Sequence, residues 1–118
     1  HQQLQQKHDI QDKVVTITYE QSDTIGRSFR DEIKRKYKNF SSKNIILDLS
    51  PMKNVLSKHI KDFVELAIYH KEFNKKTFVV VTGPIALKLL PDGINVVPTI
   101  NEAFDTIEIE DIERDLGY

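Results

Sequence analysis

Two short, almost continuously apolar runs constrain the fold of this chain most strongly. They are NIILDL at 44–49 and KTFVVVT at 76–82. Runs of this kind are typical of strands that are covered on both faces, as in parallel sheets. A segment with helical apolar spacing separates them, which is the order found in a strand–helix–strand unit. We therefore expect these strands to be adjacent and parallel in the middle of a sheet.

Further strands are predicted towards both ends of the chain. KVVTITY at 13–19 is rich in β-branched residues, which favour strands. We expect residues 1–10 to be a linker, a tag remnant or a first edge strand that pairs across the polar turn at 11–12. INVVP at 94–98 predicts a short last strand after the turn at 91–93. The sheet therefore has four to five strands, in the element order ββαβαβαβα.

The first two long helices each have a clear apolar side. The first is expected to be capped by Ser22 or Asp23, and its apolar side repeats at intervals of four residues: Ile25, Phe29, Ile33 and Tyr37. The second is expected to begin at Ser57, and its apolar side comprises Ile60, Phe63, Val64, Ala67 and Ile68. We expect Ile60, Phe63 and Val64 to be buried. Lys58, His59 and Lys61 should face solvent beside the preceding loop.

Two more helices follow the strand at 76–82. Pro84 is well placed as the first residue of a short one. Thr99–Glu102 has the form of a capping box, which begins the last helix. The residues predicted to face the core from this helix are Ile100, Ala103, Phe104, Ile107, Ile112 and Leu116. We therefore expect residues 11–118 to form a single α/β domain, a mixed sheet flanked by about four helices.

Composition excludes several classes of function. The 17 Lys and Arg nearly balance the 18 Asp and Glu, so no overall charge directs the chain to nucleic acid. The basic run at 33–38 lies largely outside the apolar stripe and is the solvated face of a helix. Cysteine is absent, which excludes thiolate chemistry and fits the reducing cytoplasm. The apolar runs are far shorter than the roughly 20 residues of a membrane span.

Motifs for catalysis, cofactors and metals are weak. The four glycines are not clustered, as a phosphate-binding loop would require. No glycines flank Ser57 in the manner of a nucleophile elbow. His59 with Asp62, or Glu65 with Tyr69 and His70, would supply too few metal ligands, and a solvated helix surface explains these residues better. We expect a non-enzymatic protein without cofactor or metal.

One serine stands out because of its position after the strand at 44–49. DLSPMKNVLSKHI at 48–60 leads from this strand through a loop to Ser57 at the start of the second helix. Serine is a preferred helix cap and contributes about 1 kcal/mol in that role. A structural cap is therefore the simplest explanation of Ser57.

This stretch resembles the phosphorylation segment of the STAS domain, the fold of bacterial anti-sigma factor antagonists. In that family a strand ending in Asp-Leu leads to a motif close to Asp-Ser-Ser-Gly-Leu, which Leu56–Ile60 matches in position. The segments 12–23, 79–94 and 101–107 are similar to other parts of the family, so the resemblance covers roughly residues 10–117. It implies phosphorylation of Ser57 by a partner kinase. The residues that it implies for partner binding are Asp23, Asn54, Ser57, Lys58, His59 and Lys61.

The resemblance implies a regulatory protein-binding module with an anti-sigma factor or a related regulatory kinase as partner. A phosphate would add nearly two negative charges and block docking, and a helix N-terminus would help to hold it. Leu56, Lys58 and His59 depart from the family's acidic residue, second serine and glycine. One alternative is therefore a STAS scaffold, or a domain of a larger assembly, without phosphorylation. The other is a small ligand-binding protein or enzyme that uses Ser57, His59 and Asp23.

Overall fold

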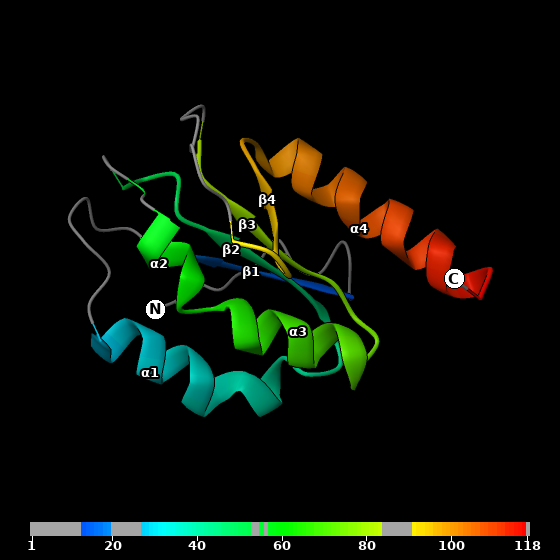
Figure 1. Ribbon diagram of the computed structural model, residues 1–118, viewed down its shortest axis with the longest axis horizontal. Helices are drawn as coiled ribbons and strands as arrows, with labels where there is room; N and C mark the ends of the chain where they lie inside the picture. The colour runs from blue at the N-terminus through cyan, green and yellow to red at the C-terminus, as the bar shows by residue number, and fades with distance from the viewer. Residues whose placement is uncertain (1–12, 20–26, 53–54, 56, 84–90, 118) are drawn as a thin grey trace.

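The computed structural model describes residues 13–19, 27–52, 55, 57–83 and 91–117 of the chain (Figure 1). It has an α/β architecture, as predicted, with a four-stranded sheet and helices on both sides. The strands are β1 Val14–Thr18, β2 Asn44–Asp48, β3 Phe78–Val81 and β4 Asn95–Val97. The helices are α1 Arg27–Lys36, the short 3-10 helix η2 Tyr37–Asn39, α2 Ser57–Lys61, α3 Val64–Glu72 and α4 Ile100–Asp115.

The described strands are all parallel and lie in the order β1-β2-β3-β4. As predicted, β2 and β3 are neighbours in the middle, with Ile46 opposite Val79. Every residue of β3 is buried, which explains its continuous apolar sequence. The antiparallel strand that would make the sheet mixed was expected within residues 3–10, which lie outside the described residues.

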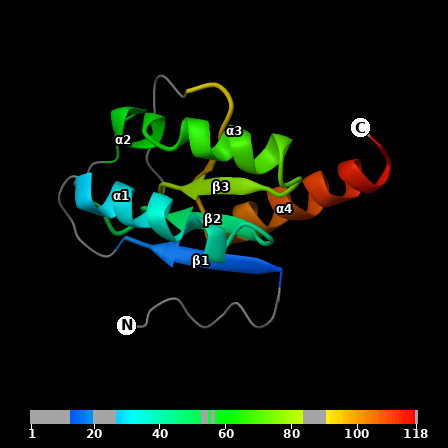
Figure 2. The same ribbon diagram turned by 90° about the horizontal axis from the view of Figure 1, so that it is seen from below.

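The order of the strands determines where the helices lie. The chain moves from β1 to β2 to β3 in one direction across the sheet, and such crossovers are right-handed. Both crossovers therefore place their helices on the same face. Figure 2 shows α1, α2 and α3 on this face and α4 on the other.

Each face of the sheet has its own apolar core. Alternate strand residues point to opposite faces, so Ile45 and Leu47 pack beneath α1 to α3 with Ile60 and Phe63. Ile46 packs on the opposite face with a second cluster, which contains Val14, Val79, Val81, Ala103 and Ile107. The described part of the first helix's apolar stripe behaves as predicted, because Ile33 is buried and Phe29 and Tyr37 pack against the core. Ile25 lies outside the described residues.

The second predicted helix is divided into two. It begins at Ser57, but α2 ends at Lys61 and α3 begins at Val64. The fully buried Phe63 lies at this break with φ −106° and ψ 1°, outside regular helical geometry. The break changes the direction of the apolar face, so Val64 is only partly buried and Ile68 is 43% exposed. The prediction that Val64 is buried and Ile68 faces the core was wrong for this reason.

The last helix begins as predicted but turns part of its apolar surface outward. The Thr99 hydroxyl accepts a hydrogen bond from the Glu102 backbone amide at 3.1 Å, which caps α4. Ala103 and Ile107 are buried against the sheet, but Ile112 and Leu116 are 54% and 65% exposed. At about 100° per residue they lie about 140° and 180° around the helix from Ile107. Their assignment to the core was therefore wrong.

The proposed capping residues Ser22 and Asp23 and the short helix after Pro84 lie outside the described residues. Within the residues that the structure describes, no helix is both long and apolar enough to cross a membrane.

Candidate functional site

The carboxyl ends of the parallel strands form one edge of the sheet, and the Ser57 loop leaves from this edge. Hydrogen bonds extend the sheet beyond the formal strand ends, because the Tyr19 amide donates to the Asp48 carbonyl at 3.0 Å. The Leu49 amide likewise donates to the Val81 carbonyl at 2.8 Å. Loops at this edge are where open α/β sheets usually carry their binding residues.

The loop between β2 and α2 is anchored to the domain by buried apolar side chains. Leu49, Met52 and Val55 are at most 3% exposed. The Asp48 carboxylate accepts a hydrogen bond from the Ser50 amide at 3.0 Å, and the Leu49 carbonyl accepts one from the Met52 amide at 3.0 Å. An aspartate that bonds the amide two residues on is a common way to fix a turn. The described residues of this loop, 48–52 and 55, are therefore fixed against the rest of the domain.

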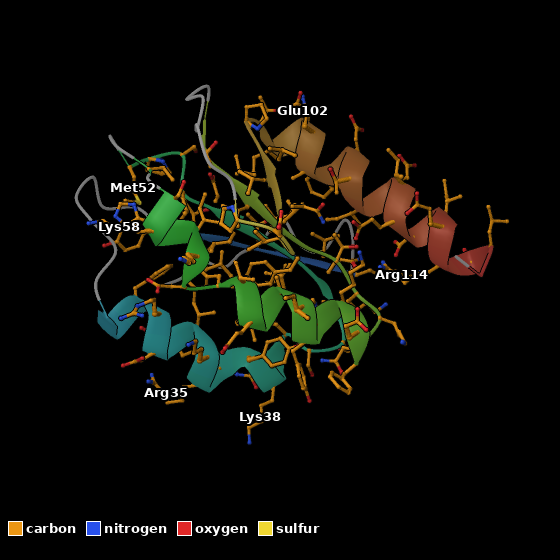
Figure 3. All side chains as sticks on the ribbon, viewed as in Figure 1. Arg35, Lys38, Met52, Lys58, Glu102 and Arg114 are labelled. Atoms are coloured by element: carbon orange, nitrogen blue, oxygen red, sulfur yellow. The ribbon has the colours of Figure 1, made fainter. Side chains whose placement is uncertain are left out.

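Ser57 is the first residue of α2 and is partly buried. Lys58 and Lys61 are exposed beside it, as predicted. Because residues four apart share a helix face, Lys61 lies one turn along from Ser57 on the same side. Figure 3 shows Lys58 at the outer surface, at the same end of the molecule as Met52 of the loop. The described part of the site is thus one serine with two nearby lysines.

His59 does not face solvent, which corrects the prediction. Its side chain is 5% exposed, because α2 turns His59 and Ile60 together towards the core. Burial lowers the pKa of His59, the positive charge of Lys58 lowers it further, and Asp62 partly opposes the shift. His59 is therefore neutral near pH 7 and does not add to the positive charge around Ser57. It is a packing residue beneath the site.

The other residues that the sequence assigned to this site are not brought together by the described structure. Asp23 and Asn54 lie outside the described residues. The end of α2 is held instead by Asp62, whose carboxylate is 3.4 Å from the Arg30 guanidinium of α1. Since α2 has five residues, its dipole gives a phosphate much less support than a long helix would. Within the described part of the chain, Lys58 and Lys61 are the positive charges that α2 itself places next to Ser57.

A buried histidine network was missed by the sequence interpretation, which placed His70 on a solvated surface. His70 is 0% exposed. Its Nε2 lies 2.7 Å from the Lys43 carbonyl, which can only accept, so Nε2 carries the proton. Nδ1 then accepts a hydrogen bond from the Tyr37 hydroxyl. The hydroxyl oxygen of Tyr37 in turn accepts a hydrogen bond from the side-chain amide of Asn74. The network ties η2 and the start of β2 to α3.

This network is structural. Burial lowers the pKa of His70, although the hydrogen bond to the Lys43 carbonyl opposes the shift. Both ring nitrogens are engaged within the protein, so neither is available as a metal ligand. Over the described ranges, no group of three His, Cys, Asp or Glu residues could hold a metal ion. The long sequence separation between Tyr37 and His70 explains why no local pattern revealed their contact.

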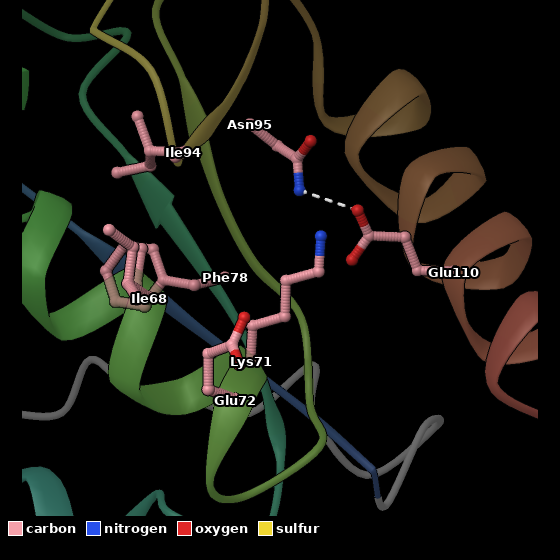
Figure 4. A pocket seen from close by; sticks show the side chains of 9 residues that line it. Ile68, Lys71, Glu72, Phe78, Ile94, Asn95 and Glu110 are labelled. Atoms are coloured by element: carbon pink, nitrogen blue, oxygen red, sulfur yellow. Dashed lines mark hydrogen bonds between the residues drawn. The ribbon is translucent and has the colours of Figure 1, made fainter. Parts of the chain in front are cut away.

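A pocket of about 300 Å³ lies at the opposite end of the sheet, between α3, β4 and α4 (Figure 4). Its apolar wall includes Ile68, Phe78 and Ile94. Glu110 of α4 already accepts hydrogen bonds from the Thr77 hydroxyl at 2.8 Å and the Asn95 amide at 3.0 Å. The volume is at the lower limit for small-molecule sites. Because Glu110 is already hydrogen-bonded to Thr77 and Asn95, these polar groups mainly join α4 to the sheet.

Glu110→Ala should lower the free energy of unfolding by about 1–3 kcal/mol. The substitution removes the shared acceptor of two partly buried donors, and unsatisfied donors are costly. Glu108→Ala on the exposed side of the same helix is the matched control and should change stability by less than about 0.5 kcal/mol. Urea unfolding measures both. Equal effects of the two substitutions would mean that Glu110 does not hold α4 in place.

The fold and the loop together define an α/β domain with a serine presented at the carboxyl edge of a parallel sheet. No model of a known protein family matches the chain, and no curated protein matches it.

Proposed function

We propose that this chain is a non-enzymatic regulatory module of the STAS type, similar to anti-sigma factor antagonists. Its partner is an anti-sigma factor or a related regulatory kinase in the cytoplasm. Phosphorylation of Ser57 controls the binding. The observation that carries the proposal is the place of Ser57, which an anchored loop presents at the carboxyl edge of the sheet beside two exposed lysines.

The loop geometry supports a surface switch. Leu49, Met52 and Val55 anchor the described part of the loop through buried contacts, so part of the surface next to Ser57 is formed before a partner binds. Binding surfaces that are already ordered lose little conformational entropy on docking. In this proposal the partner meets the unmodified serine as a small neutral group at the start of α2.

Phosphorylation acts through charge in this proposal. A phosphate adds about 1.5–2 negative charges at pH 7. Lys58 and Lys61 neutralise part of this charge within the domain, and the remainder disfavours a partner that docks over the neutral hydroxyl. The domain stays folded because the buried loop contacts and the Arg30–Asp62 ion pair do not involve the hydroxyl.

Substitutions at Ser57 should separate the switch from a helix cap. As a switch, Ser57→Ala keeps partner binding, whereas Ser57→Asp weakens it by about tenfold or more through its charge. As a cap, Ser57→Ala costs about 0.5–2 kcal/mol of stability and Ser57→Asp is nearly neutral. Isothermal titration against a candidate anti-sigma kinase, with the melting temperature of each variant, measures both properties.

Ser42→Asp is the matched control, because Ser42 is exposed and lies before β2, at the other edge of the sheet. It adds the same charge and should leave partner affinity unchanged. Equal affinity of Ser57→Asp and the unchanged chain, with both normally folded, would contradict the switch.

The departures from the family motif favour one second function, a STAS scaffold domain that is never phosphorylated. Lys58 occupies the position of the second serine, and the buried His59 replaces the family's glycine. A scaffold would bind its partner regardless of charge at Ser57. Binding that survives Ser57→Asp, together with no phosphate on Ser57 in cells, would favour this alternative.

A further inference from the structure

The C-terminal half of α4 has a second apolar side that faces away from the sheet. Ile109, Ile112 and Leu116 are 55%, 54% and 65% exposed. They lie about 140–200° around the helix from the buried Ile107. Figure 1 shows this half of α4 extending beyond the strands. We call these three residues the outer stripe.

The spacing of the outer stripe is that of a helix–helix seam. Residues at i, i+3 and i+7 correspond to positions a, d and a of a heptad repeat, which form the apolar contact between two packed helices. Alternating steps of three and four residues keep such a seam on one side of a helix. The outer stripe therefore suits a second helix better than an irregular loop.

The outer stripe is bordered by heptad positions e and g, which contact a partner helix. The charged residues at these positions are all negative. Glu108 and Asp115 occupy g positions, and Glu113 occupies an e position. All three are exposed, and no ion pair joins them to the described parts of the chain. Residues at e and g select the partner helix by charge. A complementary helix has lysine or arginine at these positions.

The α4 helix of a second copy of the chain is not such a partner, because it does not supply lysine or arginine at these positions. Two α4 helices packed through their outer stripes would bring acidic borders together, in either direction, and like charges across such a seam are destabilising. The basic helix α1 offers no substitute, because the apolar residues of its described part pack against its own core. An anionic membrane surface would also be repelled by the acidic borders.

We propose that the outer stripe of α4 is a docking site for an amphipathic helix of a different protein, with an apolar seam bordered by lysine or arginine. This site lies on the face of the sheet opposite to α2, so it is separate from Ser57 (Figure 2). It gives the chain a second interaction surface. A partner at Ser57 and a helix on α4 can therefore bind at the same time.

A pair of synthetic peptides tests this site. Each has about three heptads with Ile at a and Leu at d; one carries Lys at every e and g position and the other carries Glu. Fluorescence anisotropy with the labelled peptides should show that the lysine peptide binds the chain at least about tenfold more tightly than the glutamate peptide. Ser57→Asp should leave this binding unchanged, so failure here and failure of the Ser57 switch are distinguishable.

Substitutions in the outer stripe and its acidic borders test whether the lysine peptide binds there. The double substitution Ile109→Ser and Ile112→Ser should weaken binding of the lysine peptide by about tenfold or more. Phe73→Ser should leave this binding unchanged, although Phe73 is 71% exposed. Glu108→Lys with Glu113→Lys should reverse the preference and favour the glutamate peptide. Circular dichroism checks that each variant keeps its helices.

Three outcomes would overturn the proposal. The first is equal binding of both peptides, or of neither. The second is unchanged binding to the Ile109→Ser, Ile112→Ser variant. The third is a dimer in sedimentation experiments that this variant abolishes, because the occupant of the outer stripe would then be a second copy of the chain.

Discussion

Phe63→Ala should lower the free energy of unfolding by about 3–5 kcal/mol, the usual cost of removing a fully buried phenyl ring. Phe63 is 0% exposed and lies at the break between α2 and α3. Its ring packs against Phe29 of α1 and Phe78 of β3, each with ring centroids 6.4 Å apart. The substitution leaves a cavity where three elements meet, beneath the Ser57 site. Chemical denaturation measures the loss.

Phe73→Ala is the matched control for this prediction. Phe73 follows α3 and is 71% exposed, so its removal should change the free energy of unfolding by less than about 0.5 kcal/mol. A loss below about 1.5 kcal/mol for Phe63→Ala, or similar losses for both variants, would mean that Phe63 is not the anchor of this break.

Acidification should destabilise the protein as the pH falls below the ordinary histidine pKa of about 6.5. Burial lowers the pKa of both His59 and His70, so the folded state holds these side chains neutral. Between the lowered pKa and 6.5, the unfolded chain binds more protons than the folded protein. Stability therefore rises with pH through this window and is fully present above it. Each histidine contributes at most about 1.4 kcal/mol per pH unit.

His70→Gln tests the part of this effect that comes from His70, whose side chain is 0% exposed. Lys76 and Arg114 add positive charge near His70 and lower its pKa further. The variant should be less stable at pH 7.5, because glutamine cannot replace both hydrogen bonds, and its stability should depend less on pH. Urea unfolding from pH 7.5 to 5 gives the slopes. Identical slopes would show that His70 does not titrate differently on folding.

Sequence patterns predicted the architecture well, because the strands and the start of the last helix are each marked by a local pattern in the sequence. The continuous apolar runs identified β2 and β3 as neighbours, since such strands require cover on both faces. The capping box correctly located the start of α4. Local spacing did not reveal the break at Phe63, whose ring contacts Phe29 and Phe78, residues that are distant in sequence.

The candidate site was only partly predictable for a similar reason. Ser57, Lys58 and Lys61 lie where helical spacing placed them. His59 did not, because the short α2 turns two consecutive residues inward. Ile112 and Leu116 of the outer stripe were mistaken for core, because an apolar residue is taken as buried unless its angle around the helix is considered.

The most direct test of the central claim is the affinity of the chain with phosphate on Ser57 itself, compared with the unmodified chain. Site-specific incorporation of phosphoserine supplies the modified protein, and isothermal titration against a candidate anti-sigma kinase gives the two dissociation constants. We predict that the phosphate weakens binding by at least about tenfold while the circular dichroism spectrum stays the same. Equal dissociation constants for the two folded forms, with a kinase that binds the unmodified chain, would contradict the charge switch at Ser57.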